Sequence, residues 1–146
     1  MNENTTITER EEEITEDFSL FDSWEEKYEY IIDLGKKLEP LEEKFKVREN
    51  IIKGCQSTVW LASEFKDGKL YYKADSDALI VKGLISMLIK VLSNNTPDDI
   101  LNAKLDFIND IGMMTHLAQT RSNGLLSMIK QIKNYAFVYK SVNAPN

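Results

Sequence analysis

Apolar side chains recur with helical spacing in the first third of the chain. Residues 1–13 are polar and acidic and predict a loose extension, with a short helix over about residues 8–20 left open. The first strongly periodic segment predicts a helix over about residues 24–38, because its apolar positions share one face and Ser23 and Glu26 have capping-box spacing. Pro40 ends this helix, and a charged connection follows.

The middle of the chain alternates between apolar and polar positions, as half-buried strands do. The alternating runs 59–65 and 70–74 flank Asp67-Gly68, a pair that favours the positive φ angles of a two-residue hairpin turn. We therefore predict two antiparallel strands. A short strand at Ile51-Ile52 is left open.

Beyond the hairpin the pattern becomes helical again. An apolar helix is predicted over about residues 77–93, with Asp75-Ser76-Asp77 as its cap and dipole partner. Thr96-Pro97 resembles another helix start, which predicts a short helix to about residue 103 and a second over about residues 106–114.

The last helix is predicted to begin near Ser122-Asn123 and to continue through Ala136, before a loose tail from residue 141. A small antiparallel sheet covered by helices is an α+β architecture. The length of 146 residues suits a single domain. We therefore expect an acidic extension over residues 1–13, one domain over 14–140 and a tail over 141–146.

Charge and hydropathy narrow the classes of partner. The net charge is −6, whereas binding to a phosphate backbone requires a cationic surface, so no nucleic-acid partner is expected. No apolar run reaches the length of a membrane span, and the N-terminus lacks the basic and then apolar order of a signal peptide. We expect a cytoplasmic protein with no membrane partner.

The chain has a single cysteine, Cys55, beside Gly54 and Gln56 and just before the first predicted strand. One Cys and one His exclude a multi-thiolate zinc or iron–sulfur site and a disulfide framework within the chain. The polar, glycine-containing surroundings favour a reactive thiol. A small buried hydrophobic residue is the alternative reading of such a cysteine.

Other polar residues carry weaker signals. His116 is a candidate base for Cys55 in a Cys/His hydrolase or transferase, although a lone His is more often structural. Asp75 and Asp77 fit a helix cap better than a metal or acid/base pair. Arg121 is either a solvated charge or a cation that holds an anionic sulfur or a partner's carboxylate.

Four patches occur in order over about residues 20–135: Trp24-Glu25-Glu26-Lys27-Tyr28 with Ile31-Ile32-Asp33-Leu34-Gly35, Gly54-Cys55-Gln56-Ser57 with Val59-Trp60, Asp75-Ser76-Asp77-Ala78 with Val81-Lys82-Gly83-Leu84, and Arg121-Ser122-Asn123-Gly124-Leu125. On these patches the sequence resembles the SufE family of sulfur acceptors.

The resemblance implies a fold similar to that of the scaffold protein IscU and a role in sulfur transfer. A SufS-type cysteine desulfurase, which carries the pyridoxal phosphate, would pass persulfide sulfur to Cys55. By accepting the sulfur, the chain would free the desulfurase for its next turnover and so stimulate it. The loaded chain would then deliver the sulfur to a SufBCD-type iron–sulfur scaffold. The chain itself would carry sulfur without a metal or cofactor of its own, acting as an activator rather than a stand-alone enzyme.

The resemblance also implies roles for individual residues. Gly54 and Gln56 would shape the acceptor loop, Asp77 would contact the partner, and Arg121 would lie close to the acceptor cysteine. One departure concerns the residues before Arg121, where the family's Ser/Thr-Pro-Ser is replaced by Ala118-Gln119-Thr120. Loss of that proline is expected to loosen the turn that positions Arg121.

Overall fold

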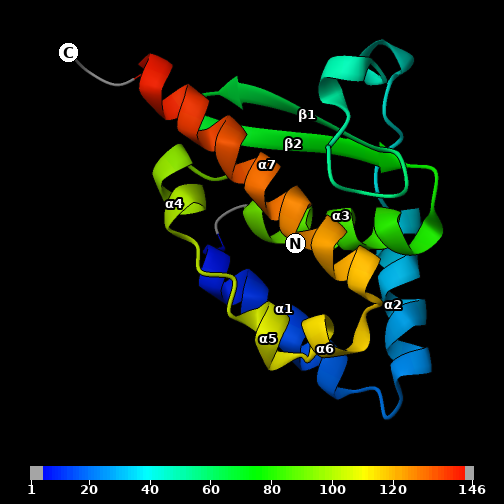
Figure 1. The fold of residues 1–146 in the computed structure, drawn as a ribbon. Helices are drawn as coiled ribbons and strands as arrows, with labels where there is room; N and C mark the ends of the chain where they lie inside the picture. Colours follow the sequence, from blue (N-terminus) through cyan, green and yellow to red (C-terminus); the bar gives the residue numbers. More distant parts are fainter. Residues whose placement is uncertain (1–4, 144–146) are drawn as a thin grey trace.

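The computed structural model describes residues 5–143, in which helices pack around one β-hairpin (Figure 1). The elements are α1 (Ile7–Ser19), α2 (Trp24–Lys36), the 3₁₀ turns η1 (Glu43–Phe45) and η2 (Arg48–Asn50), β1 (Val59–Lys66), β2 (Lys69–Ser76), α3 (Leu79–Leu92), α4 (Pro97–Asn102), α5 (Phe107–Asp110), α6 (Met113–His116) and α7 (Gln119–Asn143). This arrangement confirms the predicted α+β class. None of the helices in this part of the chain is both long and apolar enough to cross a membrane.

The hairpin has the predicted antiparallel register. Its pairs run from Val59 with Ser76 to Lys66 with Lys69. Asp67 and Gly68 have φ angles of 53° and 80°, as a two-residue turn of this kind requires. The hairpin buries one apolar face, formed by Val59, Leu61, Leu70, Tyr72 and Ala74.

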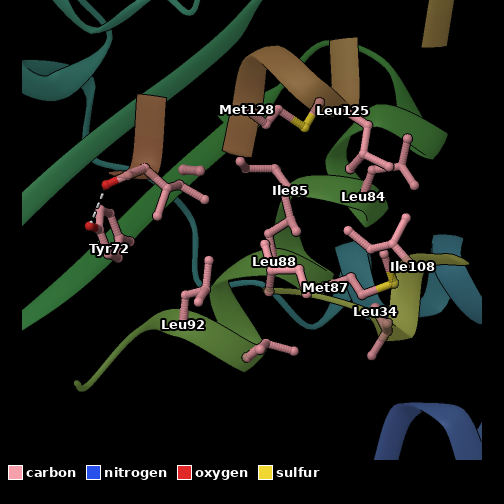
Figure 2. Close-up of a cluster of buried hydrophobic side chains, with 14 of the residues drawn as sticks. Leu34, Tyr72, Leu84, Ile85, Met87, Leu88, Leu92, Ile108, Leu125 and Met128 are labelled. Carbon is pink, nitrogen blue, oxygen red and sulfur yellow. Dashed lines mark hydrogen bonds between the residues drawn. The ribbon is translucent and has the colours of Figure 1, made fainter. Parts of the chain in front are cut away.

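Helices α3 and α7 supply much of the core beside the hairpin. Figure 2 shows Leu84, Ile85 and Leu88 of α3 facing Leu125 and Met128 of α7, and these side chains are buried. The Tyr72 hydroxyl donates to the backbone carbonyl of Ile132 at 2.7 Å, which joins β2 to α7. Helix α7 is therefore fixed against the hairpin by both apolar packing and a buried hydrogen bond.

Helices α2 and α3 approach each other at two glycines. A Cβ on Gly83 would collide with the backbone oxygen of Ile31, and a Cβ on Gly35 would lie 2.8 Å from the backbone nitrogen of Gly83. The two helices therefore cross with backbone directly against backbone. The start of α2 follows the prediction, since the Ser23 hydroxyl accepts a hydrogen bond from the Glu26 amide at 3.2 Å.

The helix left open over about residues 8–20 is present as α1, so the expected loose extension is wrong from Ile7 onward. Thr6 caps this helix in a capping box with Glu9, and Ile14 and Phe18 are buried. Arg10 is also buried and donates to the carbonyls of Val91 and Ser93 at the end of α3, at 3.2 and 2.5 Å. These contacts order the acidic segment. Residues 1–4 lie outside the described part of the chain.

The predicted cap of the apolar helix is also corrected. Strand β2 continues to Ser76, and α3 begins at Leu79 with Ala78 as an N-cap that makes no side-chain hydrogen bond. Asp75 instead forms ion pairs with Lys46 and Lys82, both at 3.3 Å. Strand pairing and these ion pairs hold Asp75 at the end of the hairpin, so it does not cap α3.

The C-terminal boundaries differ in detail from the predicted ones. The predicted helix over 106–114 is two short helices, α5 and α6, separated where Gly112 has a φ of 75°. Helix α7 begins at Gln119, several residues before the predicted start, and extends to Asn143, so residues 141–143 are helical. Residues 144–146 of the expected loose tail lie outside the described part of the chain.

Candidate functional site

Residues 53–58 form a short loop whose base is closed by hydrogen bonds. The Ile52 amide donates to the Val59 carbonyl at 2.8 Å, and Ile51 forms an antiparallel bridge with Trp60, so the segment before the loop pairs with the start of β1. At the same end, the Asp77 carboxylate accepts a hydrogen bond from the Thr58 amide at 3.1 Å. The Ser76 hydroxyl donates to the Thr58 carbonyl at 2.8 Å. We call residues 53–58 the acceptor loop.

The tip of the acceptor loop rests on the first half of α7. Gly54 has a φ of 95°, a conformation that favours glycine. A Cβ at Gly54 would collide with the Ser127 hydroxyl. Only a glycine therefore fits here, both by backbone conformation and by the space left beside α7.

Cys55 follows Gly54 and lies against the bare backbone of Gly124. Its thiol is half-buried and donates a weak hydrogen bond to the Gly124 carbonyl, with Sγ and O 3.6 Å apart. A Cβ on Gly124 would lie 3.4 Å from the sulfur. Burial raises the pKa of the Cys55 thiol, so the resting group is protonated at neutral pH. The sulfur is held as a neutral donor in this position.

His116 does not form the Cys/His pair that was left open. Its ring stacks on Trp24 with centroids 4.0 Å apart, and its Nδ1 lies 3.0 Å from the Gly112 carbonyl oxygen. The His116 carbonyl accepts the Tyr28 hydroxyl at 2.6 Å. Within residues 5–143, no hydrogen bond joins His116 to Cys55. The structure gives His116 a packing role between α2 and α6.

Arg121 and Gln56 are both exposed. Arg121 lies within the first turns of α7, one turn before Gly124, rather than in a turn ahead of the helix. Among the described residues its guanidinium has no hydrogen bond or ion pair. The segment Ala118-Gln119-Thr120 leads directly into this helix, and the Ser122 amide bonds the Ala118 carbonyl at 2.9 Å. The expected loosening of a turn is therefore not seen.

Asp75 and Asp77 have separate tasks beside the loop. Burial disfavours the charged form of Asp75, but the Ser76 amide, Lys46 and Lys82 outweigh it and hold its pKa below the usual value. Lys46 also lies over the Trp60 ring, 5.6 Å from its centroid. Asp77 anchors Thr58, so its visible role is structural. Residues 5–143 contain no group of three or more His, Cys, Asp or Glu side chains able to hold a metal ion.

Comparison with known proteins decides the family. The family described as "SufE: Fe-S metabolism associated domain" matches residues 12–136. The chain belongs to the SufE family. Membership associates it with iron–sulfur metabolism and sulfur transfer.

Curated SufE-like relatives agree with this assignment. An uncharacterized SufE-like protein of Rhizobium meliloti is 38% identical over 130 residues, covering 86% of this chain and 93% of the relative. Another from Synechocystis is 35% identical over 137 residues, covering 94% of this chain and 86% of the relative. The solution structure of a hypothetical protein from Thermus thermophilus has a TM-score of 0.73 at 17% identity, over 88% of this chain and 94% of that one. This last similarity shows a shared fold.

Two residues that contact the acceptor loop were not predicted as site residues from the sequence. Gly124 appears in the family patch around Arg121, but its contact with the sulfur was not foreseen, and Ser127 was not singled out. A glycine inside a long helix is unfavourable without a packing reason, so Gly124 offered a signal of close approach. Ser127 offered none, because its role depends on which helix faces the loop.

Proposed function

We propose that Cys55 is the sulfur acceptor of this SufE-family chain. The observation that carries the proposal is that the chain's only cysteine lies half-buried on a glycine-shaped loop, with no disulfide and a single weak hydrogen bond. Such a sulfur is sheltered at rest and lies at the surface once the loop moves. The proposed donor is the persulfide of a SufS-type cysteine desulfurase, and the proposed recipient is a SufBCD-type iron–sulfur scaffold.

The transfer is a displacement at sulfur. The Cys55 thiolate attacks the outer sulfur of the desulfurase persulfide, a new bond forms between that sulfur and Cys55 Sγ, and the old sulfur–sulfur bond breaks. The desulfurase cysteine leaves as a thiolate with the bonding electron pair. The sum is persulfide plus thiolate giving persulfide plus thiolate, so no external oxidant or reductant takes part.

The resting geometry sets a condition on this reaction. A thiolate is the nucleophile, whereas burial raises the pKa of Cys55 and its contact with α7 is to a carbonyl oxygen. Both burial and the contact with the carbonyl therefore disfavour loss of the proton while the loop rests on Gly124. We propose that docking of the desulfurase moves the loop and exposes the sulfur, which makes the chain an activator of the desulfurase rather than an enzyme on its own.

No cofactor of the chain enters this proposal, since pyridoxal phosphate belongs to the desulfurase and the carried group is sulfur itself. Gln56, Asp77 and Arg121 are proposed as partner contacts because all three are exposed, the first within the acceptor loop, the second beside it and the third on the helix beneath it. The proposed compartment is the cytoplasm, where free thiols persist.

The proposal is tested by the rate at which the desulfurase of the same organism releases alanine from cysteine. Wild-type chain is expected to raise the rate, and Cys55→Ser is expected to abolish the increase. His116→Ala, checked for retained folding, is expected to stimulate like wild type. Full stimulation by Cys55→Ser would contradict the acceptor role, and loss with a folded His116→Ala would revive the Cys/His alternative.

A further inference from the structure

We infer that Gly124 is a positioning residue that holds the acceptor loop down only while Cys55 is an unloaded thiol. Addition of a sulfur atom to Cys55 releases the loop from α7. This inference rests on the proposed function, because it concerns the state that sulfur transfer creates. The acceptor loop would then have one position in the unloaded chain and another in the chain that carries sulfur.

The first argument is the direction of the hydrogen bond. Cys55 donates its S–H to the Gly124 carbonyl, and a carbonyl oxygen only accepts. After transfer, Sγ is bonded to Cβ and to the outer sulfur and carries no hydrogen. The sulfur lone pairs then face the carbonyl lone pairs. The Sγ–H···O bond that holds the thiol is lost in the loaded form, and an ionised outer sulfur has no proton with which to replace it.

The second argument is space. Sγ lies directly on the α7 backbone, where even the missing Cβ of Gly124 would be only 3.4 Å away. One turn further along, the Ser127 side chain fills the space beside Gly54. An outer sulfur lies about 2 Å from Sγ, so it cannot be placed toward α7 at normal contact distances. It has to point away from the helix, and in the proposed loaded form the Cys55 side chain turns away from α7 with it.

The third argument is charge. A persulfide that ionises is an anion, and a desolvated position disfavours an anion. Lys53 in the loop and Arg121 on α7 are both exposed, so cationic side chains are available to an anionic sulfur at the surface. All three effects act in the same direction. The unloaded chain keeps its thiol sheltered, and the loaded chain presents sulfur to the recipient.

Hydrogen–deuterium exchange of the full-length chain tests this inference without a desulfurase. Cys55 is converted to a mixed disulfide with thionitrobenzoate, and sulfide displaces that group to leave the persulfide, which intact mass confirms. We expect amides of residues 53–58 and 119–128 to exchange about two-fold faster or more in the loaded form than in the thiol form, the factor set by a hydrogen bond at the weak end of the usual range. Equal exchange in the two forms would overturn the inference.

Two unloaded variants isolate the hydrogen bond. Cys55→Ser keeps a donor and is expected to exchange like the wild-type thiol, whereas Cys55→Ala removes the donor and is expected to exchange faster in the same two segments. Equal exchange in the Ser and Ala variants would show that the hydrogen bond to the Gly124 carbonyl does not hold the acceptor loop against α7. Because Cys55 is loaded chemically, the exchange experiment does not depend on a desulfurase. A negative exchange result would overturn this inference alone, and a negative stimulation assay would overturn the proposed function alone.

Discussion

Cys55 and Gly124 lie 69 residues apart in the chain, yet the thiol of one donates to the carbonyl of the other across 3.6 Å. This contact joins the acceptor loop to α7, which is itself fixed to the hairpin by the Tyr72–Ile132 hydrogen bond. The site is thus a sulfur on a closed loop that rests against a helix fixed to the hairpin. In the proposed mechanism, reactivity depends on whether those two parts stay together.

The reactivity of Cys55 is expected to follow its raised pKa. Alkylation by iodoacetamide in the native state should be slow at pH 7 and should rise with a midpoint above the value of about 8.5 for an ordinary thiol. The same measurement in denaturant provides the unshifted control. A native midpoint at or below that of the denatured control would contradict the description of Cys55 as a half-buried thiol whose pKa is raised.

The same shift makes a prediction about stability. The unfolded chain releases the Cys55 proton at lower pH than the folded chain, so the stabilisation is complete below the unfolded pKa and is lost as pH rises through the folded pKa. Cys55→Ser lacks this titration. The difference in free energy of unfolding between wild type and Cys55→Ser should therefore fall above about pH 8.5, and a difference that grows with pH would contradict it.

Asp77 is expected to act on the loop through its hydrogen bond to Thr58. Asp77→Ala should lower the free energy of unfolding by about 1 kcal/mol and speed alkylation of Cys55, because the Thr58 amide loses its acceptor. Asp77→Asn keeps an acceptor oxygen and should alkylate like wild type.

The two Asp77 variants also separate anchoring from partner contact. If the Asp77 charge contacts the desulfurase as proposed, Asp77→Asn reduces stimulation although the loop is intact. Normal stimulation by Asp77→Asn, measured at several concentrations of the chain, would remove Asp77 from the proposed interface.

The crossing of α2 and α3 is expected to tolerate no side chain at Gly83. Gly83→Ala should lower the free energy of unfolding by about 2 kcal/mol or more, because its Cβ would meet the Ile31 carbonyl. Gly124→Ala is the matched helical control, with ordinary contact distances, and should be neutral or stabilising by up to about 1 kcal/mol. Urea denaturation of both variants decides this, and equal effects would contradict the crossing geometry.

Arg10 is expected to hold α1 to the end of α3. Arg10→Ala should cost about 1–3 kcal/mol of unfolding free energy, because the carbonyls of Val91 and Ser93 lose a buried donor. Arg48→Ala changes an exposed arginine and should stay within about 0.5 kcal/mol of wild type. A similar cost for both, in chemical denaturation, would show that α1 is not anchored through Arg10.

Local sequence signals predicted the elements whose cause is local. The Asp67-Gly68 turn, the Ser23 cap and the Thr96-Pro97 helix start are all confirmed, since each depends on residues within one turn of the chain. The SufE resemblance is also confirmed, because four ordered patches survive as recognisable sequence. The contacts around Cys55 could not be predicted from these local signals, because they join residues far apart in the chain.

The wrong predictions concern segments whose structure depends on contacts with residues far away in the chain. The acidic segment before Ile14 is helical because Thr6 caps it and Arg10 reaches the end of α3, a contact that polar composition does not reveal. Asp75 and Asp77 follow strand pairing rather than helix capping, since Lys46, Lys82 and Thr58 hold them at the hairpin. The closeness of Gly124 and Ser127 to the loop likewise depends on where α7 crosses the hairpin.

The most direct test of the central claim is the mass of the chain after turnover. The chain is incubated with its organism's desulfurase, pyridoxal phosphate and labelled cysteine, and intact masses are taken with and without reductant. We predict a gain of one sulfur, about 32 Da, that reductant removes and that Cys55→Ser lacks. An unchanged mass beside a demonstrably active desulfurase, or an equal gain in Cys55→Ser, would contradict the assignment of Cys55 as the sulfur acceptor.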